Sequence, residues 1–117
     1  MSQFFLKLID KTKNSWNGLK NVWRFQWAFK IECIVFLIAL PCSFYVGKNG
    51  LEYALLISST FFVLIIEVLN TAIETTVNRI GFEYHELSGL AKDLGSLAIL
   101  MSIIYALVIW SIIFFIP

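Results

Sequence analysis

Two glutamates and an asparagine interrupt an otherwise apolar part of the sequence. Glu67, Asn70 and Glu74 lie between the apolar run 61–66 and the uncharged run 97–116. The two glutamates are two helical turns apart, so all three side chains project from one face of a helix. A charged side chain inside a membrane helix costs about 2.5 kcal/mol or more, and it marks a functional site by default. This face is the predicted active site.

The composition indicates an integral membrane protein. The chain has 117 residues, of which 59% are hydrophobic and 15% are charged. A soluble domain of this size has too little core to bury so much apolar surface. We expect an all-α membrane protein whose transmembrane domain, 31–117, is formed by three helices at about 28–46, 51–80 and 91–116.

Residues 1–30 are predicted to form an N-terminal amphipathic region at the membrane surface. Trp16, Trp23 and Trp27 lie on or near one helical face, and lysine and arginine residues are interspersed among them. Tryptophan and lysine together favour the headgroup region, so we expect one or two helices along the surface, with a break at 14–18. On composition alone, a basic membrane anchor without chemistry is an equally good interpretation.

The distribution of basic residues predicts the orientation. Six lysines and arginines lie in 1–30, one lies in the turn 47–52, and none follows Asp93. Lys and Arg accumulate on the cytoplasmic side, so we expect the N-terminus and the loop 79–93 to face the cytoplasm. The polar face then lies in the cytoplasmic half of the membrane.

These groups suit phosphoryl transfer to a lipid hydroxyl. Glu67 lies about 18 Å along the helix from Arg79, deep enough that it must face protein, and it is a candidate general base. Glu74 lies nearer the water, where a carboxylate can hold Mg²⁺ with its phosphate ligands. Lys92 and Asp93 return to the same depth, where a lysine can neutralise phosphate charge and an aspartate can orient it.

Two other classes of protein fit the same spacing. The polar groups can pack helices together between subunits of a non-enzymatic membrane protein, and from the spacing alone this interpretation is as good as a catalytic one. A proton or ion pathway can also use intramembrane carboxylates, but no other feature of the sequence favours it.

Longer motifs connect these residues to a known family. The sequence E-V-L-N-T-A-I-E (67–74) is followed by N-R-I-G-F-E-Y-H-E-L-S-G-L-A-K-D-L-G-S (78–96). Supporting motifs are S-W-N-G-L (15–19), A-F-K-I-E (28–32) and L-L-I-S-S (55–59). In this order, over most of the chain, the sequence resembles the small prokaryotic integral-membrane diacylglycerol kinases.

The resemblance implies an architecture and an activity. It implies a homotrimer in the bacterial cytoplasmic (inner) membrane, in which each chain has three membrane helices and an amphipathic surface helix, and active sites are shared between subunits. The implied reaction moves the γ-phosphate of MgATP to diacylglycerol and gives phosphatidic acid for phospholipid metabolism, with Mg²⁺ as cofactor and no nucleic-acid partner. A branch of the family acts on undecaprenol, which is the alternative acceptor.

The resemblance also assigns roles by position. It makes Glu67 the catalytic base, Glu74 a metal ligand, and Asn70, Lys92 and Asp93 polar residues of the active site. The implied nucleotide-binding residues are Lys7, Asn14, Glu74, Glu83, Tyr84, His85, Lys92 and Asp93. The implied lipid-substrate residues are Ala28, Phe29, Lys30, Ile31, Glu32, Glu67 and Ser96.

The sequence departs from the family pattern at one implied metal ligand. The family usually has a second metal-binding glutamate six residues before the position of Glu32, and this chain has Gln26 there. An amide oxygen can coordinate Mg²⁺ but brings no charge, so we expect weaker metal binding unless Glu32 helps. Lys7 also stands where the family commonly has an arginine, which keeps the charge but loses bidentate geometry.

Overall fold

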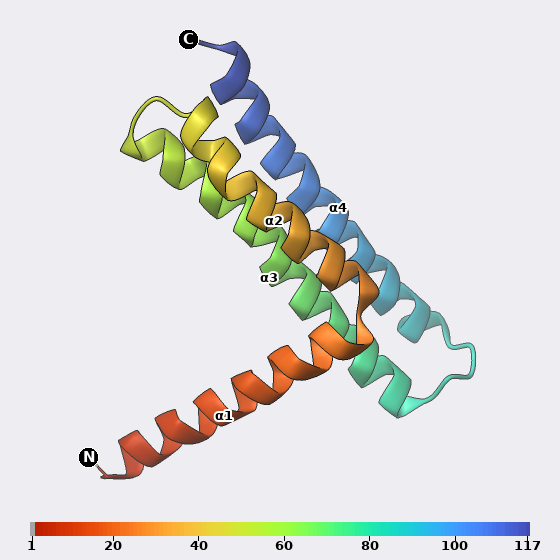
Figure 1. Cartoon of the computed structure of the whole chain (residues 1–117). Helices are drawn as coiled ribbons and strands as arrows, with labels where there is room; N and C mark the ends of the chain where they lie inside the picture. The colour runs from red at the N-terminus through yellow and green to blue at the C-terminus, as the bar shows by residue number, and fades with distance from the viewer. Residues whose placement is uncertain (1) are drawn as a thin grey trace.

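Four helices make up the chain in a computed structural model that describes residues 2–117. They are α1 (Ser2–Phe25), α2 (Trp27–Val46), α3 (Gly50–Ile80) and α4 (Glu86–Phe115). In Figure 1, α2, α3 and α4 run side by side as a bundle, and α1 leaves the bundle at one end. Contacts are most extensive between α3 and α4, and α2 packs on α3. The predicted all-α fold is confirmed.

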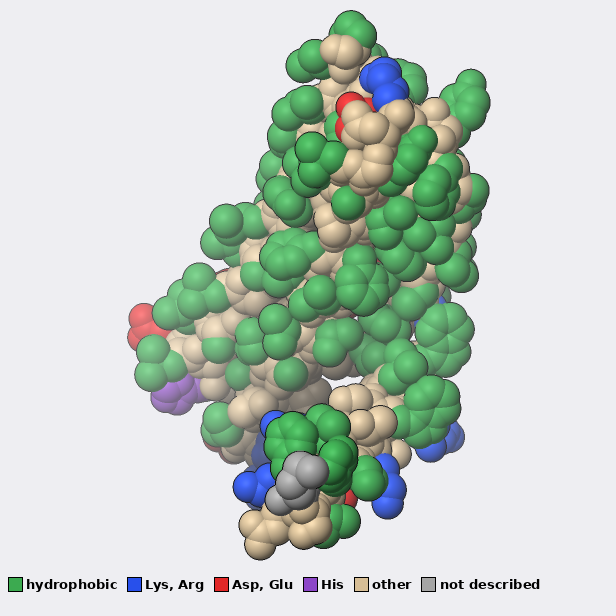
Figure 2. Space-filling model, turned by 90° about the vertical axis from the view of Figure 1, so that its left-hand side faces the viewer, with side chains coloured by type: hydrophobic (Ala, Val, Ile, Leu, Met, Phe, Trp, Pro, Cys, Tyr) green, Lys and Arg blue, Asp and Glu red, His purple; other side chains and the backbone are tan. Residues whose placement is uncertain are grey.

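The three bundle helices are each long and apolar enough to cross a membrane. In Figure 2, hydrophobic side chains cover most of the visible face of the bundle, and charged side chains gather toward its ends. So large an apolar surface is rare on a protein in water, and it suits contact with lipid. The predicted 28–46 and 51–80 are close to the observed α2 and α3.

The last helix begins earlier than the sequence predicts, at Glu86 rather than Ala91. His85 precedes it in an extended conformation, and the His85 Nδ1 accepts a hydrogen bond from the Leu87 backbone N–H at 3.1 Å. A side chain that accepts from an N–H group of the first turn caps a helix. The cap therefore starts α4 inside the polar loop, before the apolar residues begin.

The predicted break at 14–18 is wrong, because α1 continues through it. Ser15 Oγ donates to the Lys11 carbonyl at 2.8 Å, and Asn21 Nδ2 donates to the Asn17 carbonyl at 2.9 Å. These polar side chains donate to backbone carbonyls one turn earlier in the same helix, so they do not interrupt α1. The chain turns at Gln26 instead, and Trp27 belongs to α2.

A small hydrophobic cluster fixes the junction of α1 with the bundle. Val22 of α1, Phe29 of α2 and Leu64 of α3 are buried against one another, and Phe36 packs beside them. This junction and the α3–α4 loop lie at the same end of the bundle, whereas the α2–α3 turn and the C-terminus lie at the other (Figure 1). The polar half of α3 therefore lies at the end where α1 is attached.

The α2–α3 turn combines a helix cap with a close contact at a glycine. Asn49 Oδ1 accepts from the Glu52 N–H, and Glu52 Oε1 accepts from the Lys48 N–H, both at 3.0 Å. Gly47 is buried, and a Cβ placed on it would lie 2.6 Å from the Tyr53 ring and 3.0 Å from the Ser43 carbonyl oxygen. Only a glycine leaves room for this contact.

We predict that Gly47→Ala lowers the free energy of unfolding by about 1–3 kcal/mol, because the added methyl group must displace the Tyr53 ring. Unfolding in sodium dodecyl sulfate, followed by circular dichroism, measures the change. The control is Gly18→Ala, because Gly18 has open space around it within α1 and alanine is the better helix former. Equal stability of Gly47→Ala and wild type would contradict the prediction.

Candidate active site

The buried face of α3 carries two polar side chains. Its buried residues recur every three to seven positions and so share one side of the helix: Leu56, Ser59, Leu64, Glu67, Asn70 and Val77. Glu67 and Asn70 are each 6% exposed. A carboxyl group and an amide that are buried in a membrane helix need polar partners, which must come from the neighbouring helices or from a substrate.

Asn70 holds the side chain of Glu74. Asn70 Nδ2 donates to Glu74 Oε1 at 3.1 Å, one turn along α3. The other atom of the amide, Oδ1, is buried and accepts no hydrogen bond from residues 2–117. The amide thus orients the Glu74 carboxylate through its Nδ2 atom.

The position of Asn70 depends on a glycine of α4. Gly95 is buried against it, and a Cβ placed on Gly95 would collide with Asn70 Oδ1. A glycine at a helix–helix contact lets the two backbones approach closely. Sequence reasoning did not predict this contact, since a glycine in a helix gives no sign of what it packs against.

Glu32 of α2 meets Glu67 of α3. The two carboxyl groups lie close enough to influence each other electrostatically, and Glu32 Oε2 is buried without a hydrogen-bond partner within residues 2–117. Two neighbouring carboxyl groups can share one proton. The resemblance places Glu32 in the lipid-substrate set, and the structure places it beside the predicted base.

Lys92 joins α4 to the same face of α3. Its Nζ donates to Asn78 Oδ1 at 2.9 Å, and Lys92 is partly buried. Asn70, Glu74 and Asn78 follow one another at four-residue spacing, so they form a polar row along α3 that faces α4. Asn78 was not among the predicted site residues, although this spacing from Glu74 was the signal that could have found it.

The α3–α4 loop forms a small cavity next to Lys92. The cavity has a volume of about 300 Å³, and Glu83, Tyr84, His85 and Lys92 are among the residues that line it. The three loop residues are exposed. The structure therefore brings this part of the predicted nucleotide-binding set to the end of the polar row.

Other predicted nucleotide and metal residues lie apart from this row in the single chain. Lys7 and Asn14 are exposed on α1, which extends away from the bundle (Figure 1). Gln26 lines a different cavity of about 830 Å³ between α1 and α3, together with Thr71 and Thr75. Within residues 2–117, no three His, Cys, Asp or Glu side chains are grouped to hold a metal ion.

The remaining predicted residues lie on the helix surfaces or in the core. Asp93 and Ser96 are exposed on α4, and Ala28 and Ile31 are exposed on α2. Phe29 instead belongs to the hydrophobic cluster at the junction of α1 with the bundle.

Lys30 lies near the junction of α2 with α1. It is partly exposed, and its Nζ lies 5.8 Å from the centre of the Trp23 ring. A lysine over a tryptophan ring forms a cation–π contact. This contact ties the start of α2 to α1.

We predict that Gly95→Ala lowers the free energy of unfolding by about 1–3 kcal/mol, because the methyl group displaces the Asn70 amide and separates α3 from α4. Unfolding in sodium dodecyl sulfate measures the loss. Gly89→Ala is the matched control, since Gly89 lies on the same helix with open space around it. A Gly95→Ala protein that is as stable as Gly89→Ala would rule out the close contact.

Comparisons with known proteins identify the family of the chain. The sequence profile of the family described as prokaryotic diacylglycerol kinase matches residues 13–114. The diacylglycerol kinase of Escherichia coli (strain K12) is 44% identical over 108 residues, which cover 92% of this chain and 88% of that protein. The diacylglycerol kinase of Haemophilus influenzae is 43% identical over 92% of both chains, and that of Helicobacter pylori (strain 26695) is 35% identical over 91% of this chain and 83% of its own. The chain belongs to the prokaryotic diacylglycerol kinase family.

Proposed function

We propose that this membrane protein transfers the γ-phosphate of MgATP to the hydroxyl of diacylglycerol and so forms phosphatidic acid. The observation that carries the proposal is the buried carboxyl of Glu67, from which a polar row on α3 leads to the loop cavity at the end of the bundle. A lipid hydroxyl reaches such a site from the membrane, and a water-soluble nucleotide reaches it from the loop. The named activity of the relatives is the same reaction class.

Glu67 acts on the acceptor. Its carboxylate accepts the proton of the diacylglycerol hydroxyl as the oxygen attacks the γ-phosphorus, and the bond from the γ-phosphorus to the bridging oxygen breaks and releases ADP. A positioned carboxylate contributes about 10²–10⁴-fold in this role. Glu32 lies against it and can take up or return that proton. Burial of the Glu67 side chain and of Glu32 Oε2 excludes water, which would otherwise compete with the lipid for the phosphoryl group.

Lys92 and the loop act on the phosphates. Phosphoryl transfer needs little covalent help from the protein and depends on positioning and charge neutralisation. Lys92 presents its ammonium group where the polar row meets the loop cavity, and Asn78 holds it there. Glu83, Tyr84 and His85 line the same cavity and form the nucleotide side of the site.

Glu74 would hold Mg²⁺ in the loaded enzyme. Mg²⁺ binds to one or two carboxylates and to substrate phosphates, and it keeps several waters. Glu74 offers oxygen ligands, is only partly buried, and is oriented by Asn70, so it fits this need. The metal supplies neutralisation of the phosphate charge when it is bound.

We also infer a homotrimer whose subunits share each site. Lys7, Asn14 and Gln26 lie apart from Glu74 in one chain, so a neighbouring copy is needed for these residues to complete a site. The excess of basic residues in 1–30 favours an N-terminus in the cytoplasm and a place in the bacterial inner membrane.

We predict that Glu67→Gln inserts and folds but loses about 100-fold or more in turnover, because an amide accepts no proton at neutral pH. The assay follows phosphatidic acid formation in mixed micelles, alongside unfolding in sodium dodecyl sulfate. Glu52→Gln is the control, since Glu52 lies at the opposite end of the bundle and an amide oxygen can still accept its Lys48 bond. A Glu67→Gln enzyme with near wild-type turnover would remove Glu67 from the mechanism.

We predict that Gln26→Glu lowers the Mg²⁺ concentration needed for half-maximal activity, because a carboxylate binds a hard cation more tightly than an amide does. The measurement is a Mg²⁺ titration at fixed ATP, with Asn21→Asp as the control for added charge near the same cavity. An unchanged Mg²⁺ requirement in Gln26→Glu would place residue 26 outside the metal site.

A further inference from the structure

The amide of Asn78 lies behind the lysine of the loop cavity. Lys92 Nζ of α4 donates to Asn78 Oδ1 of α3 at 2.9 Å, and both residues are half-buried. Lys92 lines the cavity of about 300 Å³ at the α3–α4 loop, whereas Asn78 is not among the residues that line it. A ligand in this cavity therefore meets the ammonium group, and Asn78 acts on the ligand only through Lys92.

The end of α3 and the Asn78 amide both favour an ammonium group at this place. Asn78 lies in the last turn of α3, which ends at Ile80, and the C-terminal end of a helix dipole attracts a cation. A lysine side chain has a flexible four-carbon stem, so an ammonium group without a partner samples many positions. The hydrogen bond to Asn78 selects one of these positions, at the wall of the cavity.

An amide is a suitable partner for a lysine that binds phosphate. A lysine ammonium group has three N–H donors, and the bond to Asn78 uses one of them, which leaves two for phosphate oxygens. The amide oxygen has no formal charge, so it fixes the ammonium group without forming an ion pair with it. Lys92 thus keeps its positive charge for a negatively charged ligand.

We propose that Asn78 is a positioning residue of the nucleotide site, which holds Lys92 Nζ where it contacts the phosphates of ATP. The family resemblance assigns Lys92 to the nucleotide but gives Asn78 no role. The proposal rests on the proposed function, in which Lys92 acts on the phosphates. The alternative is that the bond only ties α4 to α3.

Binding of ATP in the absence of the lipid substrate tests the proposal. Labelled ATP and Mg²⁺ are dialysed against the purified full chain in detergent micelles without diacylglycerol, and the Kd is read from the binding curve, whatever fraction of a variant is folded. Asn78→Leu removes the acceptor at similar side-chain size, so we expect the Kd to rise about tenfold, the effect of losing one hydrogen bond to a charged group. Asn78→Asp keeps an acceptor oxygen and should bind ATP more tightly than Asn78→Leu does.

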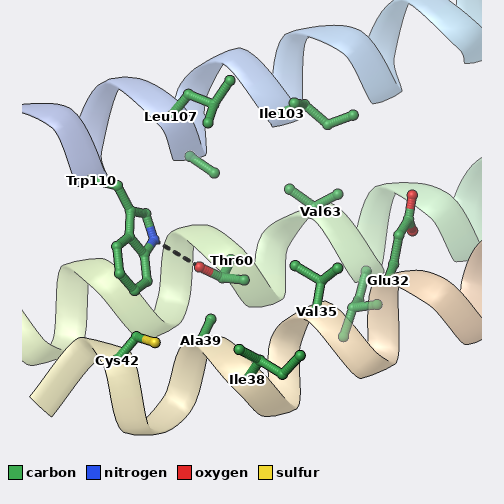
Figure 3. A pocket seen from close by; sticks show the side chains of 12 residues that line it. Glu32, Val35, Ile38, Ala39, Cys42, Thr60, Val63, Ile103, Leu107 and Trp110 are labelled. Atoms are coloured by element: carbon green, nitrogen blue, oxygen red, sulfur yellow. Dashed lines mark hydrogen bonds between the residues drawn. The ribbon is translucent and has the colours of Figure 1, made fainter.

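A second hydrogen bond between the same two helices provides the control for a loss of packing. Trp110 Nε1 of α4 donates to Thr60 Oγ1 of α3 at 2.9 Å (Figure 3). Thr60 and Asn78 lie about 27 Å apart along α3 at 1.5 Å per residue. Thr60→Val keeps the side-chain size and removes the acceptor, so it should lower the free energy of unfolding in sodium dodecyl sulfate and leave the Kd for ATP unchanged.

A double mutant shows whether Asn78 acts through Lys92. Lys92→Met removes the ammonium group and keeps most of the length of the side chain. If Asn78 only positions Lys92, Asn78→Leu adds no further rise in Kd to a protein that already carries Lys92→Met, because the two changes remove the same interaction.

Three results would overturn the proposal. They are a wild-type Kd in Asn78→Leu, an Asn78→Asp protein that binds ATP no more tightly than Asn78→Leu, and a full further rise in Kd when Asn78→Leu is added to Lys92→Met. ATP binding that depends on Asn78, in a protein that phosphorylates no diacylglycerol, would support the proposal and contradict only the choice of diacylglycerol as acceptor.

Discussion

The burial of Glu67 in a helix of membrane length is the constraint on which the arrangement of the bundle depends. A carboxyl group cannot face hydrocarbon at low cost, so α3 must turn this side toward α2 and α4. The rotation that buries Glu67 also turns Asn70, Glu74 and Asn78 toward α4, because they lie on the same face of the helix. The cost of exposing the Glu67 carboxyl group to lipid therefore sets the orientation of the whole polar row.

The neighbouring helices supply what that row needs. Gly95 allows α4 to approach α3 closely at the Asn70 amide. Lys92, which lies less than one turn before Gly95 on α4, donates to Asn78. Glu32 of α2 lies beside Glu67 of α3. Polar side chains gather at one end of the bundle, and the Thr60–Trp110 hydrogen bond lies toward the other end, with an apolar cavity between them.

Much of this arrangement could be predicted from the sequence, because helices have a regular period. The apolar runs predicted three long helices, and the seven-residue spacing of Glu67 and Glu74 predicted a shared face. The contacts Glu32–Glu67, Asn70–Gly95 and Asn78–Lys92 could not be found this way, since each depends on how two helices are rotated against each other. Local polarity was also misleading at 14–18, where side chains bond back to their own helix.

We infer that the polar row and the Glu32–Glu67 carboxyl pair transfer a phosphoryl group from a nucleotide to a membrane alcohol. The most direct test of this inference gives the purified wild-type chain ATP labelled on the γ-phosphate, Mg²⁺ and micelles with or without diacylglycerol. We expect label in phosphatidic acid only when both diacylglycerol and Mg²⁺ are present. Folded protein that leaves the lipid unlabelled would contradict it, and the buried carboxyl groups would then serve only to hold the helices together.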